Sequence, residues 1–86
     1  MSFSDLVIED AWERAGGRCE CRRSSCGHGR RCNCRLRWVD RGDDESRYGW
    51  EAHHKRAVHN GGADTLSNCE IICIDCHKNT RSYGRR

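Results

Sequence analysis

Eight cysteines in a chain of 86 residues are the feature that most restricts how this sequence can fold. A domain of this size buries little apolar surface, and small domains commonly add disulfides or metal ions for stability. The hydrophobic content of 35% and the mean hydropathy of -1.01 strengthen that requirement. We therefore expect a single domain over residues 1–86, held together by its cysteines.

The compartment decides whether these cysteines form disulfides or bind metal. The N-terminal segment MSFSDLVIEDAWERAGG lacks the basic start and the apolar stretch of a signal peptide, and no apolar run is long enough to span a membrane. We therefore expect a cytoplasmic protein with no membrane partner, in a reducing compartment where clustered cysteines bind metal. A disulfide-rich secreted protein is disfavoured for the same reasons.

The basic residues favour a nucleic-acid partner. Fourteen of the sixteen are arginines, whose guanidinium groups bind phosphate through two parallel hydrogen bonds. Seven thiolates holding two zinc ions would add a net charge of minus three, which would cancel the formal charge of +3. Affinity for a polyanion must then come from where the arginines lie rather than from their total charge.

The first half of the chain predicts a helix followed by cysteine-rich loops. Ser2 or Ser4 can cap a helix that runs to about Ala15, and Gly16-Gly17 can end it. The segment of about residues 19–34 is too rich in Cys, Gly and Arg to fold by burial, so we expect metal-organised loops with short strand pieces. The acidic stretch at 40–46 predicts a solvated turn.

The second half predicts a strand, a long loop, a second strand and a helix. YGWEAHH at 48–54 and CEIIC at 69–73 have the composition of strands, and NGGAD between them has the composition of a turn. IDCHKNTRSYG at 74–84 can form a helix that Gly84 ends. We expect Trp38 and Trp50 to lie in the core. The predicted fold class is a small α+β domain stabilised by zinc.

The spacing of Cys73 and Cys76 is typical of zinc ligands. A CxxC pair at a strand-to-helix junction lets two thiolates bind one tetrahedral zinc ion, which then needs two further ligands. Cys69, on an apolar strand, is expected to be a buried hydrophobic residue rather than a ligand. The upstream candidates are Cys19, Cys21, Cys26, His28, Cys32 and Cys34.

These candidates leave two arrangements open. With His28 as a ligand, eight groups fill two closed structural sites: one joins Cys73 and Cys76 to two upstream cysteines, and the other lies within the cysteine-rich loops. With His28 exposed, one zinc ion is sufficient. Spacing alone does not assign the upstream cysteines to one site or the other.

Three features remain that zinc binding does not use: the adjacent His53 and His54, Asn68, and His77 directly after the CxxC. The segment EAHHKRAVHNGGADTLSNCEIICIDCH resembles the HNH nuclease family, whose signature is a strand ending in Asp-His or His-His, a Gly-Gly loop, an Asn before an apolar strand, and CxxCH opening a helix. The upstream WERAGGRCEC also looks like members of that family. The resemblance covers residues 51–80, about a third of the chain.

The resemblance implies a ββα-metal fold over about residues 48–83 and a role for each residue of the motif. His53 and His77 would bind one divalent cation, His54 would be the general base that activates water, and Asn68 would brace the loop and orient the base. Neighbouring side chains on a strand point to opposite faces, so one imidazole can bind the cation while the other acts on the water. Members with Asp at the first position offer a carboxylate, whereas His53 offers a neutral imidazole. The cation would be Mg²⁺ or Mn²⁺, with Co²⁺ or Ni²⁺ also compatible with imidazole ligands.

The expected function is a metal-dependent DNA endonuclease that nicks or cuts double-stranded DNA, as a monomer or a homodimer. The basic residues that flank the motif could contact DNA phosphates, and they are Lys55, Arg56, Lys78 and Arg81. The alternative is a zinc-stabilised nucleic-acid-binding module that does not cleave. The retained histidines and Asn68 disfavour this alternative, because binding alone does not require adjacent imidazoles beside a CxxCH.

Overall fold

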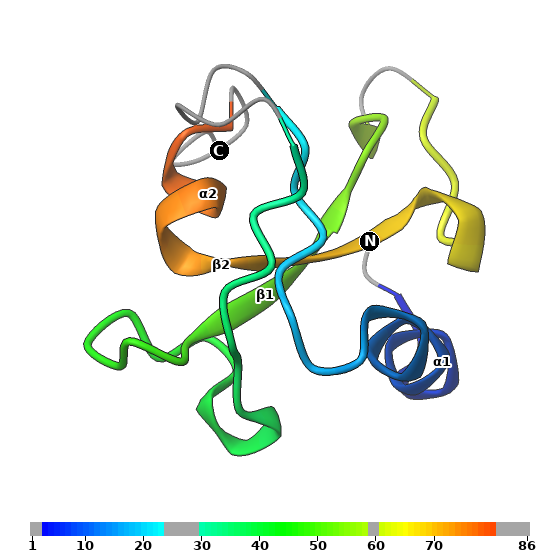
Figure 1. Ribbon diagram of the computed structural model, residues 1–86. Helices are drawn as coiled ribbons and strands as arrows, with labels where there is room; N and C mark the ends of the chain where they lie inside the picture. The colour runs from blue at the N-terminus through cyan, green and yellow to red at the C-terminus, as the bar shows by residue number, and fades with distance from the viewer. Residues whose placement is uncertain (1–2, 24–29, 59–60, 81–86) are drawn as a thin grey trace.

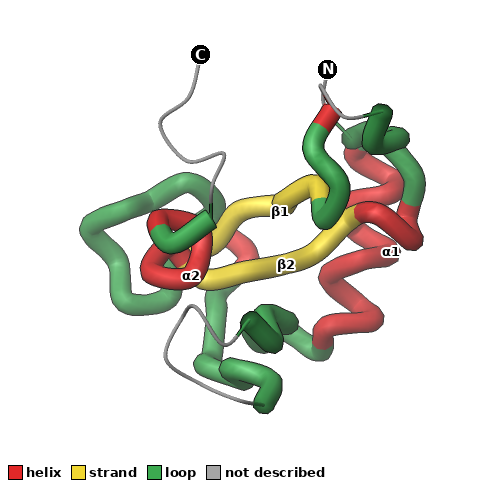
Figure 2. The backbone as a smooth tube through the Cα atoms, turned by 90° about the horizontal axis from the view of Figure 1, so that it is seen from above, coloured by secondary structure: helices red, strands yellow, loops and turns green. Residues whose placement is uncertain are grey.

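The computed structural model describes residues 3–23, 30–58 and 61–80, which form one helix, a two-stranded sheet and a short second helix. Strand β1 (Trp50–His54) pairs antiparallel with strand β2 (Cys69–Cys73), and helix α2 (Ile74–Lys78) follows β2 directly. Helix α1 (Asp5–Ala15) and α2 lie toward opposite ends of the sheet (Figures 1 and 2). The small α+β fold predicted from the sequence is confirmed.

Helix α1 begins and ends where the sequence indicates. Ser4 caps it, because its hydroxyl oxygen accepts a hydrogen bond from the Val7 N–H at 3.2 Å. Gly16 ends it with a left-handed backbone at φ 64°, a conformation that glycine adopts without steric cost. The buried face of α1 packs against β2 and consists of Ile8, Ala11 and Ala15. This contact places the N-terminal helix against the strand that leads to the second helix.

The segment after α1 covers the edge of β2 that β1 leaves unpaired. The Glu20 N–H donates to the Ile71 carbonyl at 2.8 Å, and the Ile71 N–H donates to the Glu20 carboxylate at 2.9 Å. Further along, the Cys73 N–H donates to the Cys19 sulfur at 3.3 Å. The Glu20 carboxylate and the Cys19 sulfur thus accept hydrogen bonds that backbone carbonyls of a third strand would otherwise accept. The N–H groups of Ile71 and Cys73 on this edge of β2 therefore have acceptors.

The cysteine-rich segment folds back on itself beside this edge. The Cys19 N–H donates to the Cys34 carbonyl at 2.9 Å, and the Cys32 N–H donates to the Cys21 carbonyl at 2.8 Å. The two arms run side by side across the sheet (Figure 1). Metal-organised loops with short strand pieces were predicted here. The described part pairs its backbone in this ladder, with an isolated bridge between Arg18 and Arg35.

Three tryptophans pack together beneath β1, and one of them is placed differently from the prediction. Trp50 is fully buried, and its indole N–H donates to the Arg37 carbonyl at 2.8 Å. Its ring contacts those of Trp12 and Trp38, with centroids 4.7 Å and 5.4 Å away. Trp38 was expected in the core, but 45% of its surface is exposed. It covers Trp50 from outside because it lies in a 3-10 turn, η2 (Trp38–Asp40), at the surface.

Helix α2 is shorter than the sequence suggests. It was expected to run to Gly84, but it ends at Lys78. The Asn79 side chain donates to the Asp75 carbonyl at 3.0 Å, and the Thr80 hydroxyl donates to the His77 carbonyl at 2.7 Å. These side chains satisfy the last carbonyls of the helix, so no further turn is needed. Residues 81–84 lie outside the described part of the chain.

Candidate functional site: paired histidines and a thiol cluster

The adjacent histidines lie at the end of β1, opposite the start of β2. His53 pairs with Glu70 and His54 pairs with Cys69 in the antiparallel register. Because successive side chains of a strand alternate between its faces, the two imidazoles leave the backbone in opposite directions. Each imidazole therefore has different neighbours.

On one face, His53 meets His77 of α2. Their ring centroids are 5.9 Å apart, and the rings meet edge to face at 69°. Burial, together with the charges of Arg23, His77 and His54, lowers the pKa of His53 to about 4. Burial also lowers the pKa of His77, although Glu51 opposes this. Both imidazoles are thus neutral near pH 7 and have the nitrogen lone pairs that a metal ion requires.

An ion pair borders this face of the sheet. The Arg23 guanidinium contacts the Glu70 carboxylate at 2.8 Å, and it also donates to the Cys21 sulfur at 3.4 Å. Glu70 is buried and lies directly across from His53 in the sheet. Neither Arg23 nor Glu70 was singled out from the sequence, because only the pairing of β1 with β2 brings them beside His53.

On the opposite face, His54 lies between an aromatic ring and a carboxylate. Its ring stacks on Phe3 with centroids 3.9 Å apart and planes 18° from parallel. Its Nε2 lies 2.6 Å from Oδ1 of Asp64. Neither neighbour was predicted from the sequence. A carboxylate between the Gly-Gly pair and Asn68 was the available signal for Asp64, whereas nothing local pointed to Phe3, fifty-one positions upstream.

Asn68 joins both ends of the loop between the strands. Its side-chain oxygen accepts from the Arg56 N–H at 2.8 Å, and its amide nitrogen donates to the carbonyls of Arg56 and Ala63 at 3.1 Å and 2.9 Å. Asn68 is the last residue of a 3-10 turn, η4 (Leu66–Asn68), directly before β2. These bonds hold the described parts of the loop against the strand ends that carry His54 and His53.

The Gly-Gly pair of this loop is required by the close approach of the backbone. Gly61 has a φ of 87°, which favours glycine. At Gly62, an added Cβ would lie 1.8 Å from the Arg56 carbonyl oxygen, so no other residue fits without moving the backbone. The same turn is closed by the Gly62 N–H, which donates to the Ala57 carbonyl at 2.9 Å.

Four thiols from three segments converge beside α2. The sulfurs of Cys19, Cys32, Cys73 and Cys76 all lie within 4.8 Å of one another. A zinc ion with four Zn–S bonds of 2.3 Å separates its sulfurs by about 3.8 Å. The observed spacing is therefore close to that of a tetrahedral site, and the donor set of four thiols suits zinc. These four cysteines could hold a zinc ion that ties the N-terminal segment to the CxxC of the second half.

Two further cysteines adjoin this cluster. Contacts with Cys19 and Cys73 raise the pKa of the Cys34 thiol, while hydrogen bonds from the Cys19 and Cys34 thiols lower the pKa of Cys73. Cys21 is fully buried and accepts the Arg23 hydrogen bond through its sulfur. Cys26 and His28, the other expected ligands, lie outside the described residues.

Cys69 stands apart from the cluster. It is fully buried on β2, and burial raises the pKa of its thiol to about 11. A neutral thiol in apolar surroundings is a poor metal ligand, because binding requires the thiolate. None of the seven cysteines in the described part of the chain forms a disulfide.

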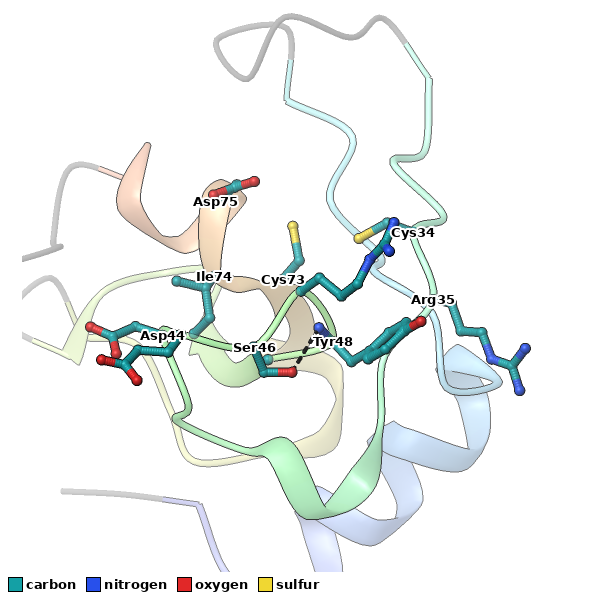
Figure 3. Close-up of a pocket in the computed structure, with 11 residues that line it drawn as sticks. Cys34, Arg35, Asp44, Ser46, Tyr48, Cys73, Ile74 and Asp75 are labelled. Carbon is teal, nitrogen blue, oxygen red and sulfur yellow. Dashed lines mark hydrogen bonds between the residues drawn. The ribbon is translucent and has the colours of Figure 1, made fainter.

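A cavity of about 540 Å³ adjoins the thiol cluster, on the side of the acidic turn. Figure 3 shows Cys34 and Cys73 on facing segments of its wall, with the Tyr48 N–H donating to the Ser46 hydroxyl at 3.0 Å below them. Its lining includes none of the motif histidines and combines three carboxylates with two guanidinium groups: Asp44, Glu45, Asp75, Arg35 and Arg47. The paired histidines, and not this cavity, therefore form the candidate catalytic site.

Three of the four expected DNA-contact residues are described, and all three are exposed: Lys55, Arg56 and Lys78. Lys55 and Arg56 directly follow β1 and thus continue from His54, while Lys78 directly follows His77. Arg81 lies outside the described residues. No helix in the described part of the chain is long and apolar enough to cross a bilayer.

The comparisons with known proteins agree with this geometry. The family model for HNH endonucleases matches residues 30–82, which is more than half of the chain. The chain belongs to the HNH endonuclease family. A search of curated proteins found no match. The matched residues of this HNH domain include both strands, helix α2, the paired histidines, Asn68 and the CxxCH, whereas α1 and the first cysteines lie outside the match.

Proposed function

We propose that this HNH domain is a metal-dependent DNA endonuclease that hydrolyses phosphodiester bonds, and that His54 is its general base. The observation that carries the proposal is the divergence of the two adjacent imidazoles. His53 meets the His77 ring at 5.9 Å on one face of the sheet, while His54 is held by Phe3 and Asp64 on the other. A pure binding module would not require this arrangement.

His53 and His77 would hold the catalytic divalent cation. Both imidazoles are neutral at pH 7 because burial lowers their pKa values, so each can offer a nitrogen lone pair. When bound, a Mg²⁺ or Mn²⁺ ion would stabilise the negative charge that develops on the phosphate and on the leaving oxygen. An imidazole pair suits Mn²⁺, Co²⁺ and Ni²⁺ better than Mg²⁺, which prefers oxygen ligands.

His54 would activate the water molecule that acts as the nucleophile. Its imidazole accepts a proton from a water molecule, the water oxygen bonds to phosphorus, and the bond from phosphorus to the 3′ oxygen breaks. The 3′ oxygen then takes a proton from solvent, which leaves a 3′ hydroxyl and a 5′ phosphate. Asn68 keeps the loop after β1 in place through its bonds to Arg56 and Ala63.

The thiol cluster would hold structural zinc rather than take part in the reaction. Four thiolates fill a tetrahedral zinc site and leave no position for water or substrate. The four cysteines that lie closest to one another are Cys19, Cys32, Cys73 and Cys76. Cys21, Cys34, Cys26 and His28 remain the candidate ligands for a second ion. Cysteines that bind zinc and form no disulfides also fit a reducing, cytoplasmic setting.

DNA would approach along the exposed basic residues beside the motif. Lys55 and Arg56 follow the proposed base, and Lys78 follows a proposed cation ligand, so phosphate contacts at these positions would bring the scissile bond to the site. Arg81 would extend the same contacts. Such contacts carry little sequence information, so we expect little sequence preference from this domain. A monomer would nick one strand, and a homodimer would cut both.

The proposal is tested by incubating purified protein with supercoiled plasmid across a series of divalent cations. We expect nicking with Mg²⁺ or Mn²⁺ that EDTA stops. His54→Ala should abolish nicking while DNA binding, measured by a gel shift, stays unchanged. A wild-type protein that binds DNA but nicks it with none of the cations would instead be a non-catalytic binding module. Nicking retained in His54→Ala would assign the base to another residue.

A further inference from the structure

The proposed base has a charged partner that the motif does not include. Nε2 of His54 lies 2.6 Å from Oδ1 of Asp64, at the short end of the range for a hydrogen bond between an imidazole and a carboxylate. The two side chains are 16% and 25% exposed, so water competes little for this contact. A carboxylate accepts and does not donate, so the hydrogen between them belongs to Nε2.

The plane of the same imidazole is fixed by a second contact. Phe3 stacks on it at 3.9 Å and 18°, and Phe3 is itself buried. Phe3 directly precedes Ser4, the residue that caps α1, so the stacking ring is anchored to the N-terminal helix. A hydrogen bond at one nitrogen and a stacked ring on one face together define both the tilt and the rotation of the imidazole.

Asp64 is held in turn by the loop that Asn68 organises. The Asn68 amide donates to the carbonyl of Ala63, the residue directly before Asp64, at 2.9 Å. Thr65, directly after Asp64, leads into η4, whose last residue is Asn68. Asn68 therefore acts on His54 through the position of Asp64, because the described contacts of its side chain are with Arg56 and Ala63 and not with the imidazole.

We propose that Asp64 is a positioning residue that holds His54 in the tautomer with hydrogen on Nε2, so that Nδ1 is the nitrogen that takes the proton from water. This inference rests on the proposed function, because it concerns the orientation of the proposed base. After the transfer, the imidazolium carries hydrogen on both nitrogens and lies beside the Asp64 carboxylate. The carboxylate stabilises that positive charge while the proton stays on the imidazole.

The first test reads the tautomer and does not depend on activity. In protein labelled with ¹⁵N-histidine, long-range proton–nitrogen correlations above neutral pH distinguish a protonated ring nitrogen from one with a lone pair. We expect hydrogen on Nε2 of His54 in the wild-type protein, and a changed tautomer ratio in Asp64→Ala. Hydrogen on Nδ1 in the wild-type protein would overturn the proposal, whether or not the protein cleaves DNA.

The second test separates positioning from folding by kinetics. Asp64→Asn keeps the size of the side chain but removes its charge and can donate to Nε2, which favours the wrong tautomer. We expect its kcat for plasmid nicking to fall by about 100-fold to 1000-fold, within the range of about 100-fold to 10,000-fold that general-base catalysis contributes. KM should stay within about 3-fold, because Asp64 does not contact DNA in this proposal. The matched control is Asp10→Asn, an exposed carboxylate on α1, which should keep both values.

The outcomes distinguish this inference from the function on which it rests. Wild-type nicking with an unchanged kcat in Asp64→Asn, together with loss of nicking in His54→Ala, would refute the role of Asp64 and keep the nuclease. A wild-type protein that does not nick would refute the nuclease, and the tautomer measurement would still decide whether Asp64 holds the imidazole. Partial recovery of kcat in Asp64→Glu relative to Asp64→Ala would support a carboxylate-specific role.

Discussion

Arg14 joins helix α1 to the start of β2, and its removal tests how the motif is held in place. Its guanidinium donates two hydrogen bonds to the Glu20 carboxylate, at 2.7 Å and 2.8 Å. It also donates to the Leu66 carbonyl at 3.0 Å and to the Cys69 carbonyl at 2.6 Å. These carbonyls flank Asn68. The Arg14 side chain therefore links the turn that contains Asn68 to helix α1 and to the Glu20 segment along β2.

The cost of Arg14→Met follows from these contacts. Methionine keeps much of the aliphatic stem but none of the donors. The Arg14 side chain is 36% exposed and that of Glu20 is 15% exposed, so the ion pair is worth about 1 kcal/mol, at the upper end for a surface pair. Each carbonyl hydrogen bond adds about 1 kcal/mol. We expect the free energy of unfolding to fall by about 3 kcal/mol, which for a domain of this size lowers Tm by about 12–24 °C.

The assay is thermal and urea unfolding followed by circular dichroism, with the same metal content in every sample. Arg37→Met is the matched control, because it removes the same charge from an exposed side chain and should change stability by about 0.5 kcal/mol or less. Arg14→Lys should give an intermediate loss, since an ammonium cannot form the paired bonds to Glu20. A loss below about 1 kcal/mol in Arg14→Met, or one equal to the control, would refute this account.

Three further expectations concern pH, the loop and the metal. Burial raises the pKa of Glu20, but its arginine partner and a backbone N–H outweigh burial and lower it below 4.5. The stabilisation that the Glu20 carboxylate contributes is therefore complete above about pH 4.5 and is lost as the pH falls through the lowered pKa. In Glu20→Gln, the free energy of unfolding should consequently depend less on pH in the acid range. Asn68→Ala should lower the free energy of unfolding by about 2 kcal/mol and speed hydrogen exchange at the Arg56 amide, whose acceptor it removes. Unchanged exchange at that amide would show that Asn68 does not hold the loop. Cys76→Ser should lower zinc content and Tm, whereas Cys69→Ser should keep the zinc, and loss of zinc in Cys69→Ser would show that Cys69 is a ligand.

The secondary structure of the motif could be predicted because its signals are local. CEIIC was predicted as a strand and is β2, and Ser4 and Gly16 delimit α1 as their capping preferences indicate. The family could be inferred from the order and spacing of a few residues, because each of them has a fixed position relative to the two strands and the helix of the ββα arrangement. Local signals were weaker at the end of α2, where the side chains of Asn79 and Thr80 stop the helix before Gly84.

The surroundings of the site were decided by packing between distant segments. Phe3 reaches His54 because α1 docks on β2, and Cys19 reaches Cys73 because the segment after α1 covers the free edge of that strand. Such contacts join residues about fifty positions apart, and no local pattern encodes them. Trp38 shows the same limit: its hydrophobic side chain suggested the core, but the surface turn that carries it leaves 45% of it exposed.

The sequence alone determined which chemical groups this protein has: adjacent imidazoles on a strand, a CxxCH at a strand-to-helix junction, and more cysteines than a small core requires. Strand alternation and helix periodicity act over a few residues, so they already separate His53 from His54. The family resemblance already implied that His53 and His77 lie together, and the structure brings their rings to 5.9 Å. Only the tertiary structure decided that His54 meets Asp64 and Phe3. The physical reason is that hydrogen bonds and ring contacts depend on distances that chain folding sets, not on positions along the chain.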